Sequence, residues 1–162
     1  MMERDFGTIA DLVRLHARHS PDRAALADAQ HTLSYGALDA LMDRIAAGLQ
    51  RDGLGAGDAI AVCALSSVHY AAVFLGALRA GVAVAPLAPG STPASLARMI
   101  ADADARILFT DASAAEVVGP AQPGGIPRVA LDGSQTGRSL DDWLPPPATT
   151  PKPACSSSAA ST

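Results

Sequence analysis

The chain has 162 residues, of which 49% are hydrophobic and only 4% aromatic, and its formal net charge at pH 7 is −4. This length suits one domain or part of a larger one. The acidic balance without a basic patch argues against nucleic acid and anionic membrane surfaces as partners. Cys63 and Cys155 are its two cysteines, too few for a disulfide framework. The charged first residues lack a following apolar run, so we expect no signal peptide and a cytoplasmic protein.

The N-terminal part predicts one helix and two short strands. Thr8 followed by Asp11 forms a capping box in which Asp replaces the usual Glu or Gln, and it predicts a helix over residues 9–19. Residues 24–29 and 32–34 are typical of short strands on either side of a turn.

The clearest helix begins after Ser34, whose hydroxyl is a suitable N-cap, and ends at Gly53. Its apolar side chains recur at helical spacing, as Leu38, Leu41, Met42, Ile45, Ala46 and Leu49. Gly53, Gly55 and Gly57 then follow a helix and precede a strand, with GxGxG spacing. A dinucleotide loop needs GxGxxG after a strand and before a helix, so we interpret these glycines as a turn.

The stretch 59–89 organises the rest of the chain as strand, helix and strand. We expect a strand at 59–64, a helix at 68–80 that Ser66 or Ser67 caps, and a second strand at 82–85 that ends at Pro86. A helix that joins two strands makes a parallel βαβ unit.

A transmembrane helix is the alternative for this stretch, because no charged residue occurs from Ala59 to Leu78. Ser66, Ser67 and His69 fall at the centre of that run, where lipid tolerates polar groups least. We therefore predict no membrane span. The helix at 68–80 is apolar on every side and so needs cover on all sides.

The remaining elements continue the alternation. Thr92 with Pro93 starts a helix, 105–110 is a strand, 113–118 a short helix, and 128–131 a further strand. We expect residues 139–144 to form a short helical turn that positions Trp143.

The predicted fold is therefore α/β, with three layers and a largely parallel sheet that carries helices on both faces. Its parallel strands lie near 60–64, 82–85, 106–110 and 128–131. Residues 1–144 form this domain, and the proline- and serine-rich residues 145–162 are expected to be a disordered tail.

Few residues are candidates for catalysis or metal binding. His16 and His19 share a helix face but have no third ligand in view. Asp111 is the best carboxylate, since it follows a parallel strand at the end where α/β sheets place ligands, although a structural role in capping or solvation is the preferred interpretation. Ser66 and Ser67 have no partner base. We expect Cys63 to be a small hydrophobic residue of the core.

The sequence holds no phosphate-binding loop. Residues 133–139 are one residue short of a P-loop and carry Arg138 where a Lys must reach the phosphates, so we interpret them as an ordinary loop. Residues 149–153 contain Thr-Thr-Pro-Lys-Pro without any glycine, and Gly137 is the last glycine of the chain. Such a loop needs glycines so that main-chain N–H groups can approach the phosphate oxygens.

Between about residue 7 and residue 111, the chain contains a series of short sequence motifs that together resemble those of a known enzyme family. These motifs are Thr8-Ile9-Ala10-Asp11-Leu12, Ser20-Pro21-Asp22-Arg23-Ala24-Ala25-Leu26, Thr32-Leu33-Ser34-Tyr35-Gly36-Ala37-Leu38-Asp39, Arg44-Ile45-Ala46-Ala47-Gly48-Leu49, Gly53-Leu54-Gly55-Ala56-Gly57-Asp58, Phe74-Leu75-Gly76-Ala77-Leu78-Arg79-Ala80-Gly81 and Ala85-Pro86-Leu87-Ala88-Pro89. Together they resemble the N-terminal portion of adenylate-forming (AMP-dependent synthetase/ligase) enzymes. Peptide-synthetase domains usually carry Asp, and many acyl-CoA ligases Asn, at the place of Ala88. The resemblance therefore favours an acyl- or aryl-CoA ligase.

The resemblance implies a two-step reaction with a carboxylic acid, Mg·ATP and CoA, through an acyl adenylate to a thioester. The family's phosphate loop, Tyr-Gly-x-Thr-Glu segment, ribose-binding Asp and C-terminal Lys all lie beyond the matched region. We therefore assign no catalytic, cofactor-binding or metal residue and expect a fragment that is inactive alone. The alternative is a non-catalytic α/β binding or interaction module with the same fold, and hydride transfer is a poorer third hypothesis because GxGxxG is missing.

Overall fold

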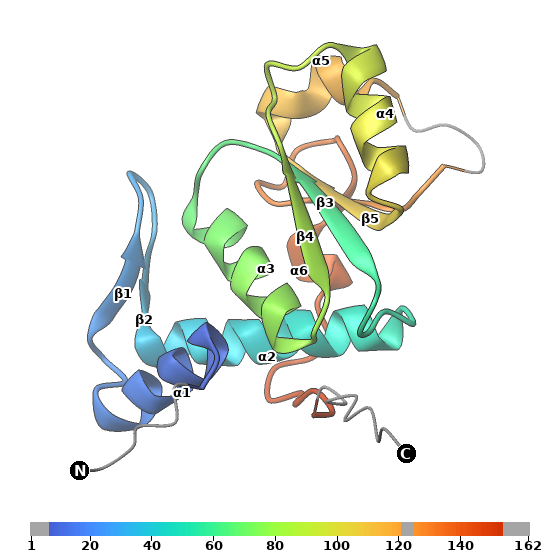
Figure 1. Ribbon diagram of the computed structural model, residues 1–162. Helices are drawn as coiled ribbons and strands as arrows, with labels where there is room; N and C mark the ends of the chain where they lie inside the picture. Colours follow the sequence, from blue (N-terminus) through green and yellow to red (C-terminus); the bar gives the residue numbers. More distant parts are fainter. Residues whose placement is uncertain (1–6, 121–124, 154–162) are drawn as a thin grey trace, which may run out of the picture.

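The computed structural model describes residues 7–120 and 125–153 and is shown in Figure 1. The helices are α1 (Ile9–His19), α2 (Tyr35–Arg51), α3 (Val68–Arg79), α4 (Pro93–Asp102), α5 (Ala115–Val118) and α6 (Leu140–Trp143), with a 3-10 turn at Ala112–Ala114. The strands are β1 (Ala24–Ala27), β2 (Thr32–Ser34), β3 (Ala59–Cys63), β4 (Ala83–Leu87), β5 (Ala105–Thr110), β6 (Arg128–Ala130) and β7 (Arg138–Ser139).

Five strands form one parallel sheet in the order β4-β3-β5-β6-β7, and β1 and β2 form a separate antiparallel hairpin. The parallel βαβ unit is confirmed, because Ile60 pairs with Val84 and Ala61 with Ala85 in parallel register. Side chains alternate across the sheet, so that Ile60 and Val62 enter the main core while Ala61 and Cys63 enter a smaller core on the other face.

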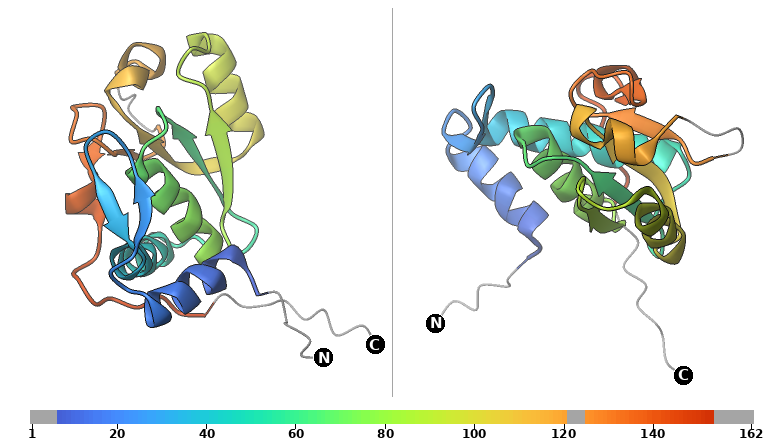
Figure 2. Two further views of the ribbon diagram at one scale, coloured as in Figure 1. Left: turned by 90° about the vertical axis from the view of Figure 1, so that its left-hand side faces the viewer. Right: turned by 90° about the horizontal axis from the view of Figure 1, so that it is seen from above.

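Helices cover both faces of the sheet, which confirms the three-layer prediction (Figure 2). α1, α2, α3 and α6 contribute to the main core, whereas α4 and the segment around α5 cover the smaller one. The cover of α3 is incomplete, since Leu78 remains 40% exposed. Within the described ranges, no helix combines the length and the apolar character that crossing a bilayer requires.

The hydroxyl caps predicted from the sequence are present. Thr8 and Asp11 form the reciprocal capping box of α1, while Ser34, Ser67 and Thr92 each accept a hydrogen bond from a main-chain N–H in the first turn of their helix. These bonds satisfy amide groups that a helix leaves without partners. The choice left open between Ser66 and Ser67 falls to Ser67, which accepts from the Tyr70 N–H at 3.1 Å.

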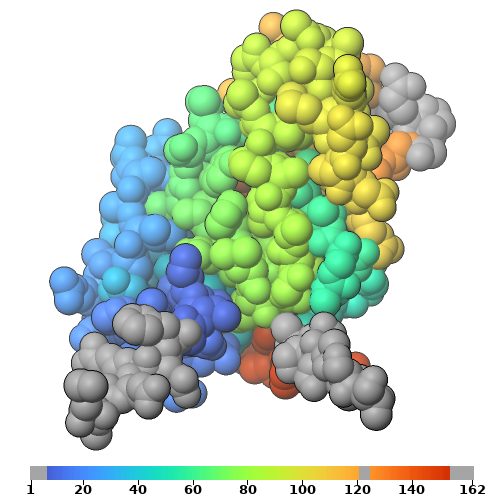
Figure 3. Space-filling view, viewed as in Figure 1, coloured from blue at the N-terminus to red at the C-terminus, as the bar shows by residue number. Residues whose placement is uncertain are grey.

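Two predictions about strands were wrong. Pro86 does not end β4 but lies within it, opposite Val62. β4 is an edge strand, visible in yellow-green down the centre of the surface in Figure 3, so proline's missing N–H faces no neighbouring strand. Residues 133–139 were expected to be a loop, yet Arg138 and Ser139 form β7 by pairing with Val129 and Ala130.

The segment from Pro145 to residue 153 lies against α2. Arg44 Nε donates to the Pro145 carbonyl at 2.8 Å, and the Gln50 side chain makes two hydrogen bonds of 2.8 Å with the main chain of Lys152. Composition gives no sign of these contacts, because they use main-chain groups that every residue carries. The predicted tail beyond Pro153 lies outside the described residues.

Helices α2 and α3 approach closely at Gly76, where an added Cβ would lie 2.7 Å from Ile45 Cβ and Cγ2. We expect Gly76→Val to lower the free energy of unfolding by about 2–3 kcal/mol, because overpacking forces two helices apart. Gly90→Val is the matched control, since nothing lies within 4 Å of its Cβ position. Urea unfolding followed by Trp fluorescence measures both variants, and equal midpoints would contradict this view of the helix contact.

Candidate functional site

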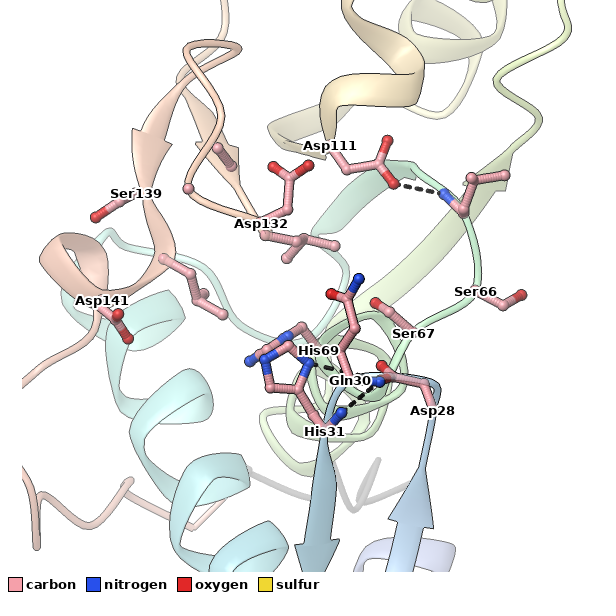
Figure 4. Close-up of a pocket in the computed structure, with 15 residues that line it drawn as sticks. Asp28, Gln30, His31, Ser66, Ser67, His69, Asp111, Asp132, Ser139 and Asp141 are labelled. Atoms are coloured by element: carbon pink, nitrogen blue, oxygen red, sulfur yellow. Dashed lines mark hydrogen bonds and ion pairs between the residues drawn. The ribbon is translucent and has the colours of Figure 1, made fainter.

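A cavity of about 390 Å³ lies at the carboxyl ends of β3, β5 and β6, the position where open α/β sheets bind ligands. Its walls come from the β1–β2 turn, the start of α3, the loops that follow β5 and β6, and α6 (Figure 4). The titratable side chains that line it are Asp28, His31, His69, Asp111, Asp132 and Asp141.

Asp111, the best carboxylate of the sequence analysis, lies in this cavity but is committed to the main chain. Its Oδ2 accepts from the Leu65 N–H at 2.9 Å, and its Oδ1 accepts from the Ser113 N–H at 3.0 Å and from the Ser113 hydroxyl. Asp111 is thus the N-cap of the 3-10 turn and ties the loop after β3 to the end of β5. This is the capping role expected for it.

Asp132 binds its neighbours in the same way. It accepts from the Ala112 N–H at 2.9 Å and the Ser134 N–H at 3.1 Å. Burial, the largest single influence, would raise the pKa of this carboxyl, but the hydrogen bonds from Ala112 and Ser134 together hold the pKa below its ordinary value. Sequence reasoning did not single out Asp132, although its place directly after a parallel strand is the signal that selected Asp111.

Asp28 was also missed, and it joins the β1–β2 turn to α3. Its Oδ2 accepts from the Val68 N–H at 2.9 Å, and its Oδ1 accepts from the Gln30 and His31 N–H groups, both at 2.8 Å. The bond from Val68, followed by those from Gln30 and His31, lowers the pKa of Asp28 to about 2. Asp28 is therefore ionised at neutral and mildly acidic pH.

Two histidines from distant segments meet beside Asp28. His31 of the hairpin and His69 of α3 form an edge-to-face pair with ring centroids 4.9 Å apart. Burial, and then the neighbouring His31, lowers the pKa of His69, while Asp28 and Asp141 act weakly in the opposite direction. The sequence could not show this pair, because its members lie 38 positions apart and in different elements.

The other histidines and the cysteine are placed elsewhere. His16 packs against Tyr35, with ring centroids 4.9 Å apart, and the Nδ1 of His19 contacts the Leu15 carbonyl at 2.9 Å. Cys63 is fully buried, and burial raises the pKa of its thiol, as suits the core residue that was predicted. In residues 7–120 and 125–153, no three His, Cys, Asp or Glu side chains converge as a metal site would need.

Side chains of the segment 133–139 form hydrogen bonds with one another and with β5. Thr136 accepts from the buried Thr110 hydroxyl at 2.7 Å and contacts the Ser134 hydroxyl at 2.8 Å. A Cβ at Gly137 would lie 2.7 Å from the Arg128 carbonyl group, so this glycine allows a close approach between two stretches of main chain. Such packing favours a structural loop over a phosphate cradle.

Comparison of folds places the chain among N-terminal α/β parts of adenylate-forming enzymes. The N-terminal domain of FACL13 from Mycobacterium tuberculosis is similar, with a TM-score of 0.75 and 21% identity over 91% of this chain and 38% of that one. VinN matches with a TM-score of 0.69 and 30% identity, over 85% of this chain and 34% of VinN.

Comparison of sequences defines the family. The model of the AMP-binding enzyme family matches residues 13–159, so the chain belongs to that family. 4-coumarate–CoA ligase 3 of Oryza sativa subsp. japonica is 36% identical over 118 residues, which are 71% of this chain and 21% of the ligase. Syringomycin synthase SyrB1 of Pseudomonas syringae pv. syringae is 33% identical over 97 residues, which are 60% of this chain and 16% of that protein. The chain thus spans about a fifth or less of these two relatives, and the resemblance to adenylate-forming enzymes is confirmed.

Proposed function

We propose that this chain is the N-terminal part of an ATP-dependent carboxylic acid–CoA ligase and that these 162 residues form no adenylate by themselves. One observation carries the proposal: the family match extends over residues 13–159, yet the sequence contains no glycine-rich phosphate loop. The 36% identity to a coumarate–CoA ligase supports the ligase branch, and Ala88 weakens the peptide-synthetase branch, which usually has Asp there.

The arrangement of the acidic side chains in the cavity supports the proposal that this part of the chain does not itself bind Mg·ATP. Asp28, Asp111 and Asp132 each accept hydrogen bonds from main-chain N–H groups, which use part of the lone-pair capacity that a metal ion would need. Adenylation depends on positioning and on electrostatic stabilisation around the phosphates, and the titratable side chains that line this cavity are four aspartates and two histidines, without Lys or Arg. In the complete ligase, residues outside this chain would bind the acid, Mg·ATP and CoA. We further propose a cytoplasmic location and no nucleic-acid partner.

Carboxylate-dependent exchange between ATP and pyrophosphate tests the proposal. With a panel of fatty and aromatic acids, we expect the purified chain to give no exchange above a no-protein control, while an intact CoA ligase assayed in parallel is active. Exchange that is clearly above background and survives deletion of residues 145–162 would refute it.

A second observation separates the ligase from the non-catalytic module. The DNA downstream of codon 162 should be read in all three frames. A glycine-rich phosphate loop encoded there supports a ligase, whereas its absence supports a binding or interaction module of the same fold.

A further inference from the structure

We propose that the tip of the β1–β2 hairpin is a proton-sensitive latch on α3, held by Asp28 and by the contact of His31 with the uncharged ring of His69, and that protonation of His69 releases the tip and opens the cavity. The tip forms one wall of the cavity at the carboxyl ends of the strands, opposite Asp141 and α6 (Figure 4). Movement of the tip therefore changes access to that cavity.

A hydrogen bond and a ring contact connect the tip to α3. The Asp28 carboxylate accepts from the Val68 N–H at 2.9 Å, and the His31 ring meets the His69 ring in an edge-to-face contact at 4.9 Å between centroids. The base of the hairpin is fixed separately, because Tyr35 and Gly36 donate to the carbonyls of Arg23 and Pro21 at 2.9 Å each. A two-stranded hairpin is marginally stable by itself, so its tip depends on these contacts.

The surroundings of His69 disfavour its protonation. His69 is half-buried in the first turn of α3, where the partial positive charge of the helix dipole is located, and His31 would be a second cation beside it. Two carboxylates face it from packed elements, Asp28 of the hairpin and Asp141 of α6. Asp28 gives little relief, because its oxygens already accept three main-chain hydrogen bonds and its Oδ1 lies 3.6 Å from His31 Nδ1.

The direction of the pH effect follows from this arrangement. The docked ring of His69 has a pKa below the ordinary value of 6.5, so the undocked state binds more protons as the pH falls through that value. Docking is thus complete above about pH 6.5 and weakens below it, while Asp28 stays ionised throughout this range.

Hydrogen exchange measured by mass spectrometry at pH 7.5 and pH 5.5, corrected for the intrinsic pH dependence of exchange, tests the latch. In the parent chain, we expect protection of residues 24–34 to fall several-fold at pH 5.5 relative to protection of β3. His69→Gln removes the titrating ring and should abolish this difference, whereas the matched control His19→Gln, at an exposed position on α1, should retain it. Asp28→Asn should reduce protection of the tip at both pH values.

A pH response of the tip that equals that of β3, or one that persists in His69→Gln, would overturn the proposal. If His69→Gln fails to fold, ring titration by NMR in the parent chain decides instead. His69 must then titrate at a lower pH than the same histidine in a peptide of residues 65–73. An equal or higher value would also overturn the proposal.

Discussion

Replacing Trp143 by alanine is expected to lower the free energy of unfolding by about 3–5 kcal/mol, the usual cost of removing a buried Trp. The indole is 3% exposed and packs edge-to-face on Phe109, with ring centroids 5.4 Å apart. Its Nε1 donates to Asp52 Oδ2 at 2.8 Å. A Cβ at Gly48 would lie 2.8 Å from the ring, which shows how closely the indole packs against α2.

Trp143→Phe is the matched variant, since it keeps an aromatic ring and loses the N–H donor to Asp52. Its expected cost is about 1–2 kcal/mol, for a smaller ring and one lost hydrogen bond. Urea unfolding must be followed by far-UV circular dichroism, because Trp143 is the only Trp of the chain. If Trp143→Ala cost no more than Trp143→Phe, the ring would not be part of the core.

Arg79→Ala is expected to lower the free energy of unfolding by about 2–3 kcal/mol, since Asp39 and Asp43 lose their buried cation and keep only their pairing with the more exposed Arg14. The Arg79 side chain is 8% exposed and joins three helices. Its guanidinium donates to Asp39 Oδ1 at 2.7 Å, to Asp43 Oδ1 at 3.0 Å, and to the carbonyls of Asp39 and Ala10, both at 3.0 Å.

Arg98→Ala supplies the control, because Arg98 pairs with Asp102 at 3.8 Å on the exposed side of α4. Its side chain is 84% exposed, and such pairs contribute at most a few tenths of a kcal/mol. Arg79→Lys should recover only part of the loss, since one ammonium group cannot reproduce the forked geometry of the guanidinium. Denaturation followed by Trp143 fluorescence compares the three variants, and equal losses for Arg79→Ala and Arg98→Ala would refute the argument.

Much of the fold could be predicted because its signals are local. The hydroxyls of Thr8, Ser34 and Thr92 cap helices whose first amides lie within three residues. The apolar periodicity from Leu38 to Leu49 likewise needs no knowledge of the partner that it meets. Such signals place helices and strands, and they predicted a parallel sheet with helices on both faces.

The candidate site could be predicted only in part. Asp111 was found because its position after a parallel strand is visible in the sequence. Asp28 was not, since its partner Val68 is 40 residues away and the turn around it looks like any other. The pairing of His31 with His69 has the same origin: two segments with no local relation are brought together by the docking of a hairpin on a helix.

The sequence by itself determined most of the helices and strands of this protein, the helix caps, the family resemblance and the absence of a phosphate loop. Only the tertiary structure decided the strand order, which makes β4 an edge that accepts Pro86, and the pairing of Val129 with Arg138, which creates β7. Strand order and side-chain convergence depend on contacts between residues far apart in the chain. Hydrophobic periodicity and capping extend over only a few residues and therefore carry no record of such contacts.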